Sequence, residues 1–140
     1  MKQLLITEQC IQQLIQYAQQ QAPYEACGII AASYDKPHLM TQFYPIRNNH
    51  RVPLHYFSYD PQHWIDCQFL LIKHNQFIAA YFHSHPNSDA ELSKFDLSGI
   101  KDFKKLQCII SLKQKDNPQL RLFQYDEINK QFIDYPLMLA

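Results

Sequence analysis

Two histidines separated by a single residue, His83 and His85, are the side chains of this sequence best suited to bind a metal ion. They end an apolar run that begins at Phe77, and Ser93 and Asp96 follow shortly afterwards. Residues two apart on a strand face the same side, so both imidazoles are predicted to point at one ion. Two imidazoles and one carboxylate leave the fourth position of a tetrahedral zinc open to water, as in catalytic rather than structural sites. The spacing therefore predicts a catalytic metal centre.

Each part of this pattern also has a simpler interpretation. An isolated His-x-His is more often two strand-end histidines than a metal site, and Ser93-x-x-Asp96 is also typical of a helix capping box. Asp89 or Glu91 in the intervening loop would replace Asp96 as ligand if that loop folded differently. The combined spacing favours the metal site, because His, His, Ser and Asp would rarely fall at these four positions by chance. Other histidine-metal sites fit worse, because the H-E-x-x-H pattern and the zinc-deaminase pattern are absent.

The surrounding elements are predicted to bring these residues together. One helix is expected after the cap Thr7, a second after Asp60 with Ile65, Phe69 and Ile72 along it, and a third over about residues 93–105. Strands are expected over residues 4–6, 26–32, 39–44, 76–83, 107–112, 120–125 and 131–135. No repeat or linker divides the chain, so residues 1–140 are predicted to form one α/β domain around a single mixed sheet.

Composition excludes several classes of protein. The formal net charge of the 140 residues is +0, so the chain lacks the basic surface of a protein that binds nucleic acid or anionic membranes. A neutral surface also gives little repulsion between copies, so self-association is compatible with the sequence, which leaves the oligomeric state open. No signal peptide is expected at the polar N-terminus, and the longest apolar run, residues 77–82, is too short to cross a bilayer.

The four cysteines are scattered singly along the chain: Cys10, Cys27, Cys67 and Cys108. No C-x-x-C pair occurs, which argues against a zinc knuckle or a thioredoxin-type site. We therefore expect reduced thiols and a cytoplasmic protein. Cys27 is expected to be a packed side chain rather than a nucleophile, and Gly28 to allow close approach of another backbone beside the site.

The segment from His83 to Asp96 resembles the signature of the JAMM, or MPN-domain, metalloproteases. That signature, H-x-H-x7-S-x2-D, is matched at every defined position. The resemblance continues in residues 23–28, at Asn48 and Pro53, and in residues 57–61, where the chain is similar to compact bacterial members. It covers most of the chain.

The resemblance implies a curved mixed sheet flanked by helices, in a cytidine-deaminase-like arrangement. It also implies that His83, His85 and Asp96 bind Zn²⁺. Glu25 would be the general base, and Ser93 corresponds to the family's serine. The link from Glu25 to a zinc site far along the chain rests on the resemblance. Taken alone, Glu25 would be a solvated glutamate at a strand edge.

The implied reaction is hydrolysis of a peptide or isopeptide bond. Family members cleave at the C-terminal tails of ubiquitin or ubiquitin-like proteins, and compact bacterial relatives are expected to act on sulfur-carrier proteins that end in Gly-Gly. Two alternatives stay open. One is a catalytically silent scaffold, against which the intact ligand set argues. The other is a peptidase of cell-wall or phage-related peptides.

Overall fold

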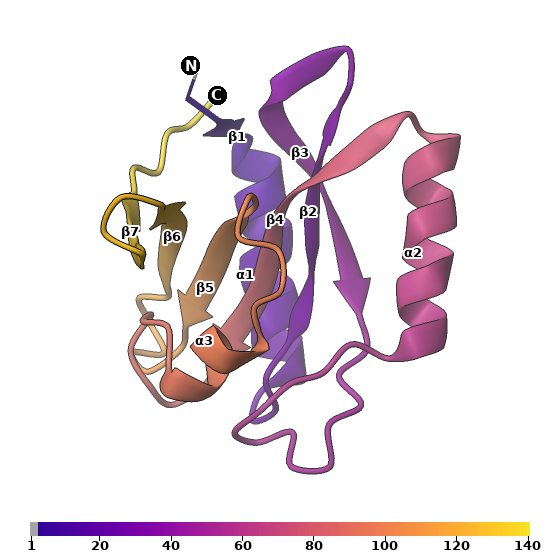
Figure 1. The fold of residues 1–140 in the computed structure, drawn as a ribbon. Helices are drawn as coiled ribbons and strands as arrows, with labels where there is room; N and C mark the ends of the chain where they lie inside the picture. The colour runs from indigo at the N-terminus through magenta and orange to yellow at the C-terminus, as the bar shows by residue number, and fades with distance from the viewer. Residues whose placement is uncertain (1–2) are drawn as a thin grey trace.

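The strands of the computed structural model, which describes residues 3–140, form one twisted sheet in the order β1-β3-β2-β4-β5-β6-β7 (Figure 1). Their bounds are β1 (Leu5–Ile6), β2 (Cys27–Ser33), β3 (Lys36–Ile46), β4 (Gln76–His85), β5 (Leu106–Ser111), β6 (Gln119–Asp126) and β7 (Gln131–Tyr135). The pairs β1–β3 and β4–β5 are parallel, and the remaining pairs are antiparallel. The predicted α/β fold around a mixed sheet is confirmed.

Two long helices begin at the side chains that the sequence predicts. The helix α1 (Glu8–Gln21) follows Thr7, whose hydroxyl accepts a hydrogen bond from the N–H of Cys10. The helix α2 (Pro61–Lys73) follows Asp60, whose carboxylate accepts from the N–H of His63. Each cap satisfies one of the N–H groups that a helix start leaves without a partner in the helix.

These helices pack against different parts of the sheet and enclose two clusters of buried side chains. Leu14 and Ala18 of α1 belong to the larger cluster, which includes Phe82 of β4. Leu71 of α2 belongs to the second cluster, with Ile29 of β2. Residues 27–32 of β2 are all buried, and the successive side chains of residues 29–32 enter the two clusters in turn, one on each face of the sheet. Figure 1 shows α1 behind the sheet and α2 at the right of the view, and the contacts of α2 are with β3 and β4 rather than with an edge strand.

The strand β4 lies in the middle of the sheet and ends in the two predicted ligands. It extends to His85, two residues beyond the predicted end. The connection from β4 to β5 carries a third helix, α3 (Lys94–Gly99). The prediction that this helix runs to residue 105 is wrong. Ile100 has extended backbone (φ −74°, ψ 125°), because the chain must turn back to Leu106, which pairs with Ala80 of β4.

None of the helices within residues 3–140 has the length and apolar character needed to cross a membrane.

Candidate metal centre

The two histidines lie at the carboxyl end of β4 and point to one side of the sheet. His83 pairs with Cys27 of β2 and Ile109 of β5, so neighbouring strands hold this end of β4 on both sides. His83 and His85 are 2% and 5% exposed, and their Nε2 atoms lie 3.1 Å apart. The prediction that both imidazoles face one point is therefore confirmed.

Asp96 reaches the same point from the first turn of α3. Its Oδ2 atom lies 3.1 Å from Nε2 of His83 and 3.1 Å from Nε2 of His85. The same oxygen accepts a hydrogen bond of 2.9 Å from the N–H of Ser93, and the Ser93 hydroxyl accepts from the N–H of Asp96. A complete capping box is therefore present, and its carboxylate also enters the site. The capping box is therefore confirmed, and it leaves the metal-ligand prediction for Asp96 open, because the same carboxylate oxygen faces both histidines.

The spacing of these three atoms fits a metal ion. Zinc bonds of 2.0–2.1 Å in a tetrahedron place neighbouring ligand atoms about 3.3 Å apart. The three observed separations are each 3.1 Å. Without a cation or a proton at their centre, two imidazole nitrogens and a carboxylate oxygen so close together would repel one another.

One backbone carbonyl fixes the orientation of His85. Its Nδ1 atom lies 2.8 Å from the carbonyl oxygen of Asp89, and because a carbonyl only accepts, Nδ1 must donate. In the neutral ring, Nε2 then carries a lone pair that points at His83 and Asp96. A hydrogen bond of this kind behind a metal-binding imidazole sets its tautomer and raises its basicity.

Burial and mutual contact shift the pKa values of the two histidines and Asp96 in different directions. Burial lowers the pKa of His83, and contact with Asp96 offsets part of that shift. Burial alone would raise the pKa of Asp96, but hydrogen bonds with His83, His85 and the N–H of Ser93 hold it well below its usual range. For His85, burial lowers the pKa, but contacts with Asp96 and the carbonyl of Asp89 outweigh it and raise the pKa. The metal-free centre thus favours a neutral His83 and an ionised Asp96, and metal binding would release the proton held by His85.

Glu25 lies beside the histidines, and one of its oxygens has no partner. Its carboxylate and the ring nitrogens of His83 and His85 lie within 4.8 Å of one another. Glu25 is 6% exposed, and its Oε1 atom is buried without a hydrogen-bond partner among residues 3–140. Burial raises the pKa of Glu25 to about 8, a shift that His85 opposes and Asp96 increases. A cation or its bound water would satisfy this oxygen, so the residues present fit a metal.

The backbone around Glu25 is held from two sides. On one side, the Glu25 N–H donates to the carbonyl of Pro53 at 2.8 Å, and its own carbonyl accepts from the Asn48 amide at 3.0 Å. On the other side, the N–H of Ala26 donates to the hydroxyl of Ser84, the residue between the two histidines, at 2.8 Å. The loop of residues 47–60 and the strand β4 therefore fix Glu25 relative to the metal ligands.

The side chain of Asn48 uses its full hydrogen-bonding capacity in this loop. Its amide nitrogen donates to the carbonyls of Glu25 and Tyr56, at 3.0 and 2.9 Å. Its oxygen accepts from the N–H groups of His50 and Ser58, at 3.0 and 3.1 Å. Asn48 is part of the resemblance to the family, but the sequence predicts no role for its side chain. Its one local signal was that asparagine commonly accepts from the backbone two residues on, as Asn48 does here from His50.

The family described as prokaryotic homologs of the JAB domain matches residues 7–124. The chain belongs to this family. The predicted resemblance to the JAMM, or MPN-domain, proteins is confirmed.

Solved structures similar to this JAB domain cover nearly all of it. Protein DSY2949 from Desulfitobacterium hafniense is 25% identical with a TM-score of 0.85, over 98% of this chain and 92% of that chain. AF2198, a JAB1/MPN domain protein from Archaeoglobus fulgidus, is 16% identical with a TM-score of 0.66, over 100% of both chains. A structure described as JAMM, a metalloprotease-like zinc site in the proteasome and signalosome, is 15% identical with a TM-score of 0.62, over 99% of both chains. These last two likenesses show a shared fold. No curated protein matches the sequence.

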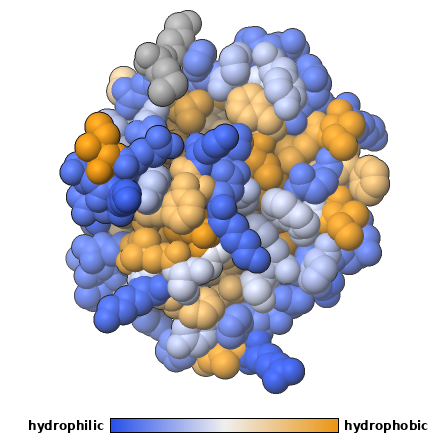
Figure 2. Space-filling view, in the orientation of Figure 1, coloured by the Kyte–Doolittle hydropathy of each residue, from blue (hydrophilic) through white to orange (hydrophobic). Residues whose placement is uncertain are grey.

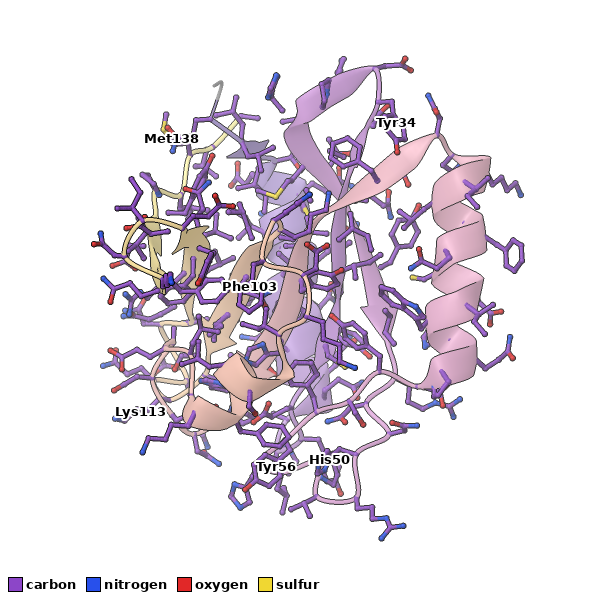
Figure 3. All side chains as sticks on the ribbon, in the orientation of Figure 1. Tyr34, His50, Tyr56, Phe103, Lys113 and Met138 are labelled. Atoms are coloured by element: carbon purple, nitrogen blue, oxygen red, sulfur yellow. The ribbon has the colours of Figure 1, made fainter. Side chains whose placement is uncertain are left out.

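The two acidic residues considered as alternative ligands lie on the surface of this JAB domain. Asp89 forms an ion pair with Lys113 at 3.3 Å, and Figure 3 labels Lys113 at the lower left of the molecule. Glu91 lies 3.8 Å from Arg121. Asp89 contributes to the centre only through its carbonyl, which orients His85. Asp96 is therefore the carboxylate of the β4–β5 connection that meets the histidines.

The neighbours of Glu25 in β2 have packing roles. Cys27 donates from its Sγ to the carbonyl of Ile46, and burial raises the pKa of its thiol, which favours the neutral thiol of a packed side chain over a nucleophilic thiolate. Gly28 is needed because a Cβ atom there would lie 2.4 Å from the carbonyl oxygen of Tyr44. The predicted close approach is confirmed, and its partner is the neighbouring strand β3.

Aromatic rings join the loop of residues 47–60 to the centre. The ring of Phe57 stacks on that of His83, with centroids 4.6 Å apart. Tyr56 contacts Phe95 of α3 at a centroid distance of 4.3 Å, and the His50 ring is tilted against that of Tyr56 at 5.1 Å. Figure 3 shows Tyr56 and His50 together below α3. This loop and α3 thus form two walls that meet next to the centre.

Proposed function

We propose that this JAB domain is a zinc metallopeptidase that hydrolyses peptide or isopeptide bonds at the Gly-Gly tail of a ubiquitin-like or sulfur-carrier protein. The observation that supports this best is the unpartnered Oε1 of Glu25 beside the three atoms of His83, His85 and Asp96. A structural site would have its fourth position filled by another tight protein ligand. Here that position faces a carboxylate of raised pKa, which suits a general base.

The positions of the residues support a division of roles within this proposal. His83, His85 and Asp96 would hold the ion, and zinc, when bound, lowers the pKa of a coordinated water to about 7. Glu25 would accept the proton of the attacking water and later deliver it to the leaving amine. The hydroxyl of Ser93 accepts from the N–H of Asp96, so its own proton remains able to donate to the developing oxyanion. One such donor contributes about 2.7–4 kcal/mol.

Two features around the centre support a protein substrate with a narrow tail. Large apolar side chains are exposed on both walls: Val52 and Leu54 on the loop, and Phe95 and Leu97 on α3. Exposed apolar groups gathered in one area favour contact with another protein. Tyr56 of the loop contacts Phe95 of α3, so the two walls meet there, and tail residues without side chains would need the least space beside them. Buried, unpaired cysteines are compatible with a cytoplasmic setting for this reaction.

The test is cleavage of defined substrates by zinc-loaded protein of measured metal content. A Gly-Gly-tailed carrier protein would be supplied with a C-terminal peptide extension, and separately joined to a lysine side chain, with products identified by mass spectrometry. Glu25→Gln should keep the zinc and lose turnover by about 10²–10⁴-fold. Glu127→Gln makes the same chemical change at an exposed site and should behave as the wild type.

The outcomes separate the alternatives. Zinc binding without cleavage of either substrate would favour a silent scaffold. Cleavage of cell-wall peptides in preference to the carrier protein would favour the other peptidase class. Wild-type turnover by Glu25→Gln would show that the base lies elsewhere.

A further inference from the structure

The outer surface of α2 is apolar, whereas that of α1 is polar. All exposed positions of α1 carry polar side chains: Glu8, Gln9, Gln12, Gln13, Gln16, Gln19 and Gln20. The exposed positions of α2 are Pro61, Gln62, Ile65, Asp66, Phe69, Leu70, Ile72 and Lys73. A surface helix normally has one apolar face, directed at the core, and a helix that is apolar all round is normally covered on both sides. One chain thus offers a direct contrast between a solvated helix and a helix that lacks an outer partner.

The exposed apolar side chains of α2 form one stripe. Ile65, Phe69 and Ile72 follow the i, i+4, i+7 spacing of a single helix face and are 46%, 68% and 76% exposed. The inner face is already used, because Cys67 and Leu71 are buried against the sheet. Figure 2 shows hydrophobic side chains along the right-hand edge of the molecule, where α2 lies in Figure 1. The α2 stripe (Ile65, Phe69 and Ile72) is therefore directed outwards.

We propose that the α2 stripe is the interface of a homodimer in which two copies of α2 pack antiparallel across a twofold axis near Phe69. The charged residues beside the stripe support a second copy as the occupant. Asp66 and Lys73 lie seven residues apart, on the same flank of the stripe. A twofold axis perpendicular to the helix brings this flank of both copies together, so Asp66 meets Lys73 of the second copy.

The pairing is self-consistent along the whole helix. An axis midway between Asp66 and Lys73 passes next to Phe69, the central residue of the stripe. Ile65 of one copy then packs near Ile72 of the other, and both charge pairs form at once. Gln62 donates to one oxygen of Asp66 and leaves the other oxygen for the lysine. Within residues 3–140, Lys73 has no ion-pair partner of its own.

The size of the stripe sets the expected affinity. The 13 residues of α2 span about 20 Å, and two such helices bury less than the about 800 Å² per partner of a standard stable interface. The dimer is therefore expected to form at micromolar rather than nanomolar concentrations. The formal net charge of +0 means that no long-range repulsion opposes it.

Sedimentation equilibrium of the full chain from about 1 to 500 μM is the first test. Phe69→Glu should weaken the association at least about tenfold, because a central apolar contact becomes a pair of like charges. Gln16→Glu adds the same charge to the exposed face of α1 and should leave the association unchanged. All three proteins should melt at similar temperatures, since both side chains are exposed. A wild type that stays monomeric to 500 μM, or a Phe69→Glu protein that associates like the wild type, would overturn the proposal.

Charge reversal tests the antiparallel geometry. Asp66→Lys and Lys73→Asp should each weaken the dimer, and the double variant should restore it, because the reversed charges meet again. Failure of the double variant to recover would exclude this pairing.

Cross-linking gives an independent readout: oxidised Phe69→Cys should form a disulfide-linked dimer and Gln16→Cys should not. The native cysteines are all buried and give no background. Equal cross-linking of both variants would also overturn the proposal.

Discussion

Replacing Glu25 with glutamine is expected to stabilise the metal-free protein. The native carboxylate is 6% exposed, and its Oε1 atom has no hydrogen-bond partner among residues 3–140. Burial raises its pKa from the ordinary value of 4.5 to about 8. At about 1.4 kcal/mol per pH unit, this rise corresponds to about 5 kcal/mol of lost stability once the group is ionised. Water that enters the metal-free site would solvate part of the charge, so we expect a gain of about 3–5 kcal/mol for the variant.

The gain should depend on pH in a defined way. Below pH 4.5 the carboxyl is protonated in the folded and the unfolded chain, so the two proteins should differ little. Between pH 4.5 and about 8 the unfolded carboxyl ionises while the folded one keeps its proton, so the wild type loses stability throughout this window. Above about 8 the difference should stay constant. Zinc should reduce this difference in stability between the variant and the wild type, because the cation compensates the buried charge of Glu25.

The assay is urea denaturation and thermal melting of both proteins in chelator, from about pH 5.5 to about pH 8.5. The variant should melt about 10 °C higher at the alkaline end. Other titrating groups are present in both proteins, so the difference between them isolates position 25. Equal stabilities at alkaline pH, or a difference that does not change with pH, would refute the argument that Glu25 is held as a desolvated carboxylate.

Four further substitutions test the rest of the centre. His83→Ala and Asp96→Ala should each lose bound zinc in elemental analysis, because two remaining protein ligands hold the ion poorly; full occupancy in Asp96→Ala would show that another carboxylate binds. Ser93→Ala should keep zinc and lose kcat by about 10²–10³-fold at similar KM if the hydroxyl meets the oxyanion. A pure cap would instead lower stability by about 1 kcal/mol and leave kcat unchanged. Asn48→Ala should lower kcat with zinc retained, because the loop no longer holds the carbonyl of Glu25. Asn49→Ala, at a neighbouring exposed position, is its matched control, and equal loss in both variants would contradict the role of Asn48.

The part of the centre that depends on local geometry could be predicted from the sequence. Placing His83 and His85 on one side needs only an extended backbone, and placing Ser93 beside Asp96 needs only the first turn of a helix. Both hold in the structure. The length of α3 could not be obtained in this way, because its end is set by the need to return to Leu106 beside β4.

The position of Glu25 depends on distant contacts that leave no periodic signal. Its backbone is held by the pairing of β2 with β4 and by Asn48, whose four bonds depend on the folding of the whole loop. The assignment of Glu25 to the metal site therefore rested on the resemblance to a known family and not on residue spacing. The α2 stripe shows a second limit of residue spacing. Helical spacing predicts a helix through Ile65, Phe69 and Ile72, yet it does not tell which of its apolar residues face the sheet.

The shared oxygen of Asp96 affects how related sequences should be compared. That atom caps α3 through the N–H of Ser93 as well as facing the histidines, so selection for a stable helix start would preserve both residues in a descendant that no longer binds metal. His83 and His85 have no comparable structural role outside the centre. In a lineage that drifts towards a non-catalytic role, the histidines would diverge first and the Ser-x-x-Asp pair would persist. The histidine pair is therefore the better marker of retained chemistry among relatives.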